Sequence, residues 1–97
     1  MIVSFADQGT EDIFNGQDTK AARKTCPETV WKAAQRKLDQ LNSVSGLYEL
    51  RTPPGNELHP LTKDRKGQHA IRVNKQYRIC FHWTDVGPPD VEITDYH

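Results

Sequence analysis

The sequence predicts a single α+β domain over residues 1–97, with two N-terminal helices packed on a small antiparallel β-sheet. The 97 residues suit one compact unit, because domains usually contain about 100 to 200 residues. Apolar residues repeat at helical spacing in the first half of the chain. In the second half they alternate with polar residues along three short stretches. These two periodicities indicate helices followed by strands.

The first 24 residues predict a strand, a short helix and a connector. Ile2, Val3 and Phe5 suit a short strand, and residues 10–14 suit one or two helical turns that stop at residues 15–16, an Asn-Gly pair. Residues 20–24 follow as a basic connector.

The clearest helix begins after this connector. Thr25 and Glu28 have the spacing of a capping box, and Pro27 suits the first helical turn. Four apolar residues then predict an amphipathic helix that ends between residues 42 and 46, namely Val30, Ala34, Leu38 and Leu41.

The second half of the chain predicts a loop followed by an antiparallel meander. Residues 47–50 suit a strand, and the prolines within residues 51–56 require a loop, which Leu58 and Leu61 would anchor to the core. Residues 69–73, 77–83 and 91–96 suit strands that are joined by short polar turns at residues 74–76 and 85–90.

Strand alternation assigns these residues to two faces of the sheet. The face expected under the helices carries Ile71, Val73, Tyr77, Ile79, Phe81, Trp83, Val91 and Ile93. The opposite face carries Gln68, Arg72, Arg78, Cys80, His82, Glu92, Thr94 and Tyr96. The second face is therefore predicted to be polar and basic.

The net charge of zero hides a separation of charge along the chain. Residues 20–82 hold thirteen basic and five acidic side chains, whereas the segments before and after them hold four acidic and no basic side chains each. Cations interleaved with amides and aromatic rings favour RNA over a membrane as partner. A solvated basic surface is the alternative. We expect the acidic ends to limit nonspecific RNA binding or to meet a basic region of a partner.

Cysteine and histidine usage predicts no metal and no cofactor. Cys26 and Cys80 are too few for a disulfide scaffold, and no Cys or His cluster has the spacing of a zinc site. No apolar run approaches the roughly 20 residues of a membrane helix. We therefore expect a soluble, unprocessed protein with reduced thiols in the cytoplasm.

Five segments in order carry a family resemblance: LRTPPGNEL (50–58), DRKGQ (64–68), IRVN (71–74), QYRICF (76–81) and VEITDYH (91–97). With the opening residues and the central helix, this series resembles the HigB branch of the RelE/ParE toxin superfamily, the killer proteins of type II toxin–antitoxin systems. The resemblance covers essentially the whole chain.

The resemblance implies a RelE-like fold with a twisted sheet and a growth-arresting activity. The activity is that of a ribosome-dependent endoribonuclease, an mRNA interferase that cleaves translated mRNA in the A site. It also implies a neutralising HigA-type antitoxin with a helix-turn-helix. The toxin would then meet operator DNA only through that antitoxin, in a complex that represses its own operon.

Such metal-independent cleavage has defined chemical needs. A base must deprotonate the 2′-hydroxyl, a cation must stabilise the phosphorane, and an acid must protonate the leaving 5′-oxygen. Arg78 lies mid-strand on the polar face and matches the arginine of the family's Tyr-Arg-Ile strand, so we predict that it binds the phosphate. An ion pair with Glu92 is the structural alternative for this arginine.

The proton-transfer groups stay open among several candidates. Asp95, Tyr96 and His97 match the family's terminal Asp-Tyr-His, which implies catalytic or base-positioning roles, and packing of the last strand is the alternative. His59 aligns with a histidine of some relatives, and a loop cap is its alternative role. Thr62 stands where relatives carry lysine, so Lys63, the next residue, is the nearest substitute.

Other basic residues are predicted to contact RNA or the ribosome. This set comprises Lys20, Arg23, Lys24, Lys63, Arg65, Lys66 and Arg72. His69 and His82 are expected to pack or to hydrogen-bond locally.

Two other functions remain open from the sequence. The same fold serves ParE-like inhibitors of DNA gyrase, since a fold does not fix an activity. A catalytically silent module that binds RNA or the antitoxin is the second alternative, which the departure at Thr62 keeps open.

Overall fold

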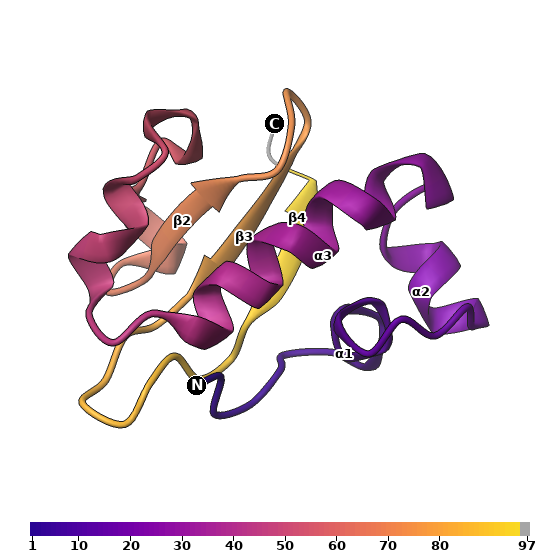
Figure 1. Cartoon of the computed structure of the whole chain (residues 1–97), viewed down its shortest axis with the longest axis horizontal. Helices are drawn as coiled ribbons and strands as arrows, with labels where there is room; N and C mark the ends of the chain where they lie inside the picture. The colour runs from indigo at the N-terminus through magenta and orange to yellow at the C-terminus, as the bar shows by residue number, and fades with distance from the viewer. Residues whose placement is uncertain (96–97) are drawn as a thin grey trace.

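A computed structural model describes residues 1–95 of the chain. Helix α3 lies across one face of a four-stranded sheet of order β1-β2-β3-β4, and α1 and α2 lie to one side (Figure 1). The helices are α1 (Gln8–Phe14), α2 (Lys20–Thr25) and α3 (Glu28–Ser43). The strands are β1 (His59–Pro60), β2 (His69–Arg72), β3 (Tyr77–Phe81) and β4 (Glu92–Asp95). No helix of these described residues is long and apolar enough to cross a membrane.

Helix α3 confirms the predicted amphipathic pattern, because its buried residues are Val30, Ala34, Leu38 and Leu41. The predicted capping box is wrong. Thr25 ends α2 instead, where its hydroxyl donates to the Ala21 carbonyl at 3.0 Å. Pro27 precedes the first turn of α3 without a side-chain cap.

The predicted connector at residues 20–24 is also wrong, because these residues form helix α2. Thr19 caps this helix by accepting the Ala22 N–H at 3.0 Å. The Thr19 hydroxyl in turn donates to the buried Asp12 carboxylate of α1 at 2.6 Å. The hydrogen bond from Thr19, followed by one from Gln8, lowers the pKa of Asp12. Asp12, one of the N-terminal acids expected to limit RNA binding, therefore has a structural role in joining α1 to α2.

The sheet confirms the three predicted strands, each shorter than expected, and the faces of their described residues. β2, β3 and β4 pair in antiparallel order, with Ile71, Ile79 and Ile93 in register. These residues, together with Tyr77, Phe81 and Val91, are buried against α3 in one hydrophobic core. Val73 and Trp83 pack at its margin.

The edges of the sheet differ from the prediction. A two-residue strand, β1, was not predicted, because Pro60 cannot donate to a ladder and is tolerated only at an edge. The expected strand at residues 2–5 is reduced to an isolated parallel bridge between Phe5 and Val91.

Residues 47–50 form a 3-10 helix (Leu47–Arg51) and not the predicted strand. The Glu49 carboxylate accepts the backbone N–H groups of Ser45 and Gly46 at 2.9 and 2.6 Å. These two local bonds stabilise the turn. Leu50 is the buried residue of this 3-10 helix.

The residues on either side of β1 pack into different hydrophobic clusters. Leu58 packs against the main core as predicted, but Leu61 does not. Leu61 forms a second, small cluster with Ala70 and Cys80, which point away from α3. Cys80 is therefore buried on the face predicted to be polar, and this burial raises the pKa of its thiol.

Gly9 sets the distance between α1 and α2. A Cβ at this position would lie 2.5 Å from the Ala21 carbonyl and 1.8 Å from the Thr25 hydroxyl. We expect Gly9→Ala to lower the free energy of unfolding by about 1 to 3 kcal/mol, because overpacking forces the helices apart. Gly55 is the matched control, since a Cβ there meets nothing within 4 Å. Urea denaturation measures both variants, and equal stability of the two would contradict this account of the helix contact.

His69 should make stability depend on pH. Its ring stacks on Phe81 with centroids 6.5 Å apart, and burial, with a smaller effect of His59, lowers its pKa below 6.5. The unfolded chain then binds the proton more tightly, so this contribution to stability is complete above pH 6.5 and is lost as the pH falls below it. We expect the melting temperature of His69→Phe to fall less between pH 7.5 and 5.0 than the melting temperature of the natural chain. Parallel melting curves would refute the assignment.

Candidate functional site

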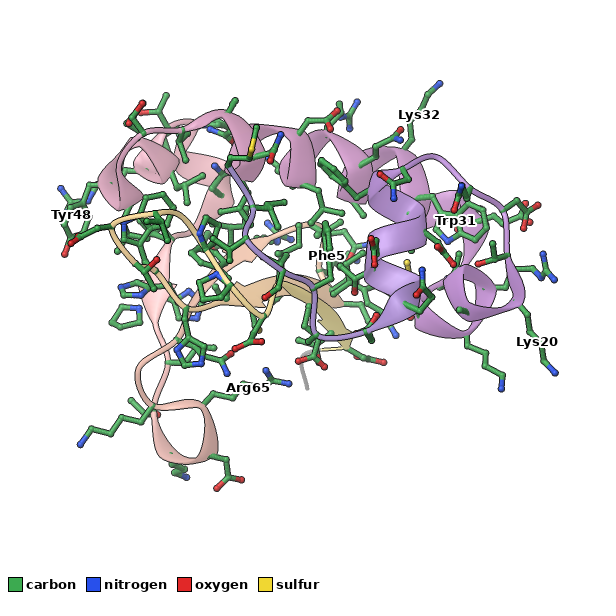
Figure 2. The ribbon with its side chains drawn as sticks, turned by 90° about the horizontal axis from the view of Figure 1, so that it is seen from below. Phe5, Lys20, Trp31, Lys32, Tyr48 and Arg65 are labelled. Carbon is green, nitrogen blue, oxygen red and sulfur yellow. The ribbon has the colours of Figure 1, made fainter. Side chains whose placement is uncertain are left out.

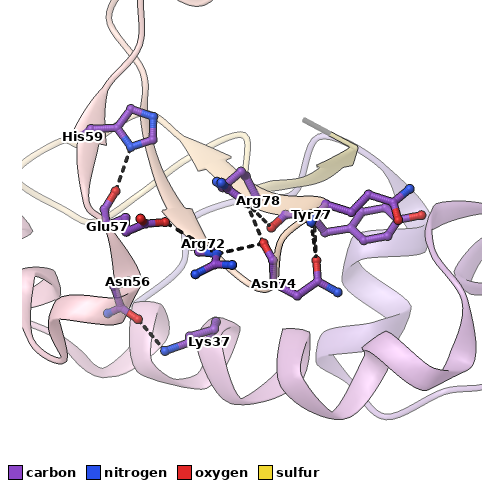
Figure 3. Close-up of polar contacts among 9 residues, drawn as sticks. Lys37, Asn56, Glu57, His59, Arg72, Asn74, Tyr77 and Arg78 are labelled. Atoms are coloured by element: carbon purple, nitrogen blue, oxygen red, sulfur yellow. Dashed lines mark hydrogen bonds and ion pairs between the residues drawn. The ribbon is translucent and has the colours of Figure 1, made fainter. Parts of the chain in front are cut away.

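Two arginines meet on the polar face at the turn between β2 and β3. Arg72 and Arg78 are directly opposite each other in the β2–β3 register. Both side chains donate to one oxygen, the main-chain carbonyl of Asn74, from Arg72 Nε at 3.1 Å and from Arg78 Nη1 at 2.6 Å (Figure 3). Arg78 Nη1 also donates to the Tyr77 carbonyl at 3.2 Å. The turn thus places two guanidinium groups side by side, and guanidinium is a group that can bind carboxylate or phosphate.

The local sequence explains why the chain turns here. The Asn74 side-chain oxygen accepts the backbone N–H groups of Gln76 and Tyr77 at 2.9 and 2.7 Å. Asparagine favours turns because its short amide can bond to the backbone two or three residues ahead. The Val73 N–H donates to the Tyr77 carbonyl at 3.0 Å and closes the hairpin.

His59 is connected to this arginine pair through Glu57. The His59 Nδ1–H donates to the Glu57 carbonyl at 2.7 Å, and the Glu57 carboxylate forms an ion pair with Arg72 Nε at 3.5 Å (Figure 3). Bonding to a carbonyl places a proton on Nδ1, so the neutral ring carries its basic lone pair on Nε2. Glu57 holds its position with a left-handed backbone, at φ 49°.

A buried asparagine anchors the loop that carries His59. Asn56 is fully buried, accepts from Lys37 Nζ of α3, and donates to the Gln40 side chain and the Leu50 carbonyl at 3.0 and 3.1 Å. Burial, and to a lesser extent Arg36, lowers the pKa of Lys37. The loop is thereby tied to α3.

The end of β4 brings Asp95 to the same turn. Asp95 pairs with Tyr77 in the sheet and accepts from Gln76 Nε2 at 2.9 Å. Burial, followed by Asp95, raises the pKa of the Tyr77 phenol. Tyr96 and His97, the other predicted C-terminal candidates, lie outside the described residues.

Glu92 pairs with Arg65 and not with Arg78, so the structural alternative considered for Arg78 is wrong. Arg65 Nη1 lies 3.1 Å from the Glu92 carboxylate and 3.2 Å from the Gln68 side-chain oxygen. This ion pair fastens the loop of residues 62–68 to β4. Lys63 and Lys66 remain exposed on that loop, and Lys63 has a left-handed backbone at φ 56°.

The predicted cations of α2 lie elsewhere. Lys20 and Arg65 are well separated in Figure 2, with Lys20 at the right of the view and Arg65 below the middle. Lys24 is exposed on the same helix as Lys20, and Arg23 pairs with Asp18 at 2.6 Å. Apart from Arg72, which belongs to the arginine pair, the basic residues predicted to contact RNA or the ribosome therefore fall into two groups.

Three residues of the site were not predicted, namely Glu57, Asn74 and Gln76. Only Asn74 had a usable signal, since an asparagine in a predicted turn favours such side-chain bonds. The contacts of the other two depend on the loop and on β4. Among residues 1–95, no group of three or more His, Cys, Asp or Glu side chains is arranged to hold a metal ion.

Comparisons with known proteins agree with this architecture. Residues 3–97 match the HigB-like toxin family, described as the RelE-like toxin of the type II toxin–antitoxin system HigB. Toxin HigB-1 of Vibrio cholerae serotype O1 is 39% identical over 85 residues, which span 88% of this chain and 86% of the relative. An uncharacterised Haemophilus influenzae protein is 37% identical over 57 residues, or 59% of this chain and 56% of that protein.

A solved structure shares the fold. The YoeB–YefM complex from Staphylococcus aureus contains a chain that superposes with a TM-score of 0.60 at 11% identity, over 100% of this chain and 98% of that one. The predicted RelE-like α+β fold is therefore confirmed, with a third short helix added. Family match, identity and fold agree, and the chain belongs to the HigB-like family of RelE-type toxins of type II toxin–antitoxin systems.

Proposed function

We propose that this protein is a ribosome-dependent endoribonuclease that cleaves translated mRNA in the A site and inhibits translation. Toxins of the HigB family are ribonucleases, which supports the reaction class. The observation that carries the proposal is the arginine pair, because Arg72 and Arg78 converge on one carbonyl at 3.1 and 2.6 Å. Two guanidinium groups suit a phosphorane, whose negative charge increases as the 2′-hydroxyl attacks.

The pair supplies electrostatic stabilisation and needs proton-transfer groups beside it. His59 has its Nδ1–H committed to the Glu57 carbonyl at 2.7 Å, so Nε2 is the nitrogen that would take the 2′-hydroxyl proton. Asp95, Tyr96, His97 and Lys63 are the remaining candidates for the acid and the base. Cleavage by this route would leave a 2′,3′-cyclic phosphate and a free 5′-hydroxyl.

The two basic groups suit a large RNA partner. Lys63, Arg65 and Lys66 lie on the loop beside the site, where they would contact the message. Lys20, Arg23 and Lys24 lie on α2, apart from that loop, and would meet ribosomal RNA. Such contacts depend on salt, because they release counterions.

The family also implies the partner that restrains this activity. We propose a HigA-type helix-turn-helix antitoxin, encoded beside the toxin, in a cytoplasmic complex that meets operator DNA only through the antitoxin. The YoeB–YefM structure is a complex that contains a chain of the same fold, and it supports such pairing. An adjacent reading frame for a helix-turn-helix protein of roughly 100 residues would agree with this.

Arg78→Ala should relieve toxicity. Removing the cation that faces the phosphate should lower the rate of mRNA cleavage by roughly a hundredfold or more, since electrostatic groups of this kind contribute on the order of 10²- to 10³-fold. Growth after induction and cleavage on purified ribosomes measure the effect. Arg36→Ala, an exposed change on α3, is the matched control. Full toxicity of Arg78→Ala at equal protein level would refute the assigned role.

Mapping RNA 5′ ends after induction should separate the proposed activity from its alternatives. We expect cuts within translated codons, each carrying a 5′-hydroxyl. A module that merely binds RNA leaves no such ends. A gyrase inhibitor would block supercoiling by purified gyrase while messages stay intact, and that result would reject the ribonuclease.

A further inference from the structure

We propose that Asn74 is a positioning residue that aims Arg72 and Arg78 together at one phosphate. This inference rests on the proposed function, because it assumes that the arginine pair binds the reacting phosphate. Among the described residues, Asn74 bonds to the backbone of Gln76 and Tyr77 and to the two arginines. Its carbonyl receives both guanidinium groups, and its side chain fixes the direction of that carbonyl.

The arginine pair needs an acceptor between its members. Arg72 and Arg78 are cross-strand partners, and like charges directly opposite each other destabilise a sheet. The Asn74 carbonyl offsets this repulsion, because it accepts from both side chains at 3.1 and 2.6 Å. Without that oxygen the two side chains would point apart. A phosphate would then meet one arginine at a time.

The side chain of Asn74 decides where the carbonyl points. Its oxygen accepts the N–H groups of Gln76 and Tyr77 at 2.9 and 2.7 Å, which fixes the path of the chain on both sides of the turn (Figure 3). Tyr77 is buried in the core and is therefore a rigid reference point. Gln76 extends the same network to Asp95 at 2.9 Å. One amide group thus links the core, the arginine pair and the end of β4.

Two substitutions separate this role from a general effect on stability. Asn74→Ala removes the side-chain acceptor, whereas Asn74→Ser keeps a shorter one that forms similar but weaker turns. Asn42→Ala is the matched control, because the Asn42 side-chain oxygen also accepts a backbone N–H, from Ile2 at 2.9 Å, at a distance from the arginines. Melting temperatures of the three variants give the purely structural cost.

The arginine side chains provide a readout that is independent of activity. The Nε–H signal of Arg72 and the Nη–H signal of Arg78 in ¹⁵N spectra, assigned with Arg72→Lys and Arg78→Lys, report the two hydrogen bonds to the Asn74 carbonyl. We expect both signals to shift toward those of exposed Arg36 in Asn74→Ala, to shift partly in Asn74→Ser, and to stay in place in Asn42→Ala. Unchanged signals in Asn74→Ala would overturn the inference.

Single-turnover cleavage on ribosomes provides the second readout. We expect Asn74→Ala to lower the rate by roughly tenfold to a hundredfold, as a small misplacement of catalytic groups does, with partial rescue in Asn74→Ser. The loss should be much smaller when Arg72→Ala is already present, because Asn74 acts through the pair. An equal loss in both backgrounds would contradict the inference. If the natural chain itself fails to cleave, the proposed function fails, and the arginine signals still decide the positioning role.

Discussion

The packing of β3 fixes the direction of every functional side chain on the strand. Tyr77, Ile79 and Phe81 are buried beneath α3, so the residues between them must face the opposite side. A register shift of one residue would bury Arg78 and expose the core set, which makes that register strongly specified. The position of Arg78 therefore depends on apolar contacts that it does not make. The same strand therefore provides core residues that stabilise the fold and the arginine proposed for the chemistry.

The turn between β2 and β3 adds a second constraint, which fixes where the guanidinium groups of Arg72 and Arg78 lie. The sheet brings Arg72 and Arg78 opposite each other, but strand geometry alone does not oppose the repulsion between their charges. Carbonyl oxygens and the Glu57 carboxylate do so, at distances of 2.6 to 3.5 Å. Because Glu57 also lies next to the anchored Asn56, the arginine pair is coupled to α3 through the loop.

Sequence periodicity was sufficient for the elements that contact the core along their length. Helix α3 and the three long strands were predicted because each repeats apolar residues at its own period. Helix α2 was missed, since it is six residues long and depends on a hydrogen bond from Thr19 to Asp12. The pairing of Arg65 with Glu92, 27 residues apart, likewise has no local signature. Much of what the sequence could not predict depends on polar side chains that bond to other elements or, as Glu49 does, to nearby backbone.

The neutral composition takes on a physical meaning once these contacts are known. Several acids have specific partners: Asp7 caps α1, Asp12 holds α2, Asp18 pairs with Arg23, and Glu92 pairs with Arg65. These acids therefore act locally as caps and ion-pair partners. Exposed lysines such as Lys63 and Lys66 are then cations that we propose for RNA contact, since an exposed charge is only weakly offset by distant ones in salt. Net charge alone is thus a poor guide to the partners of so small a protein.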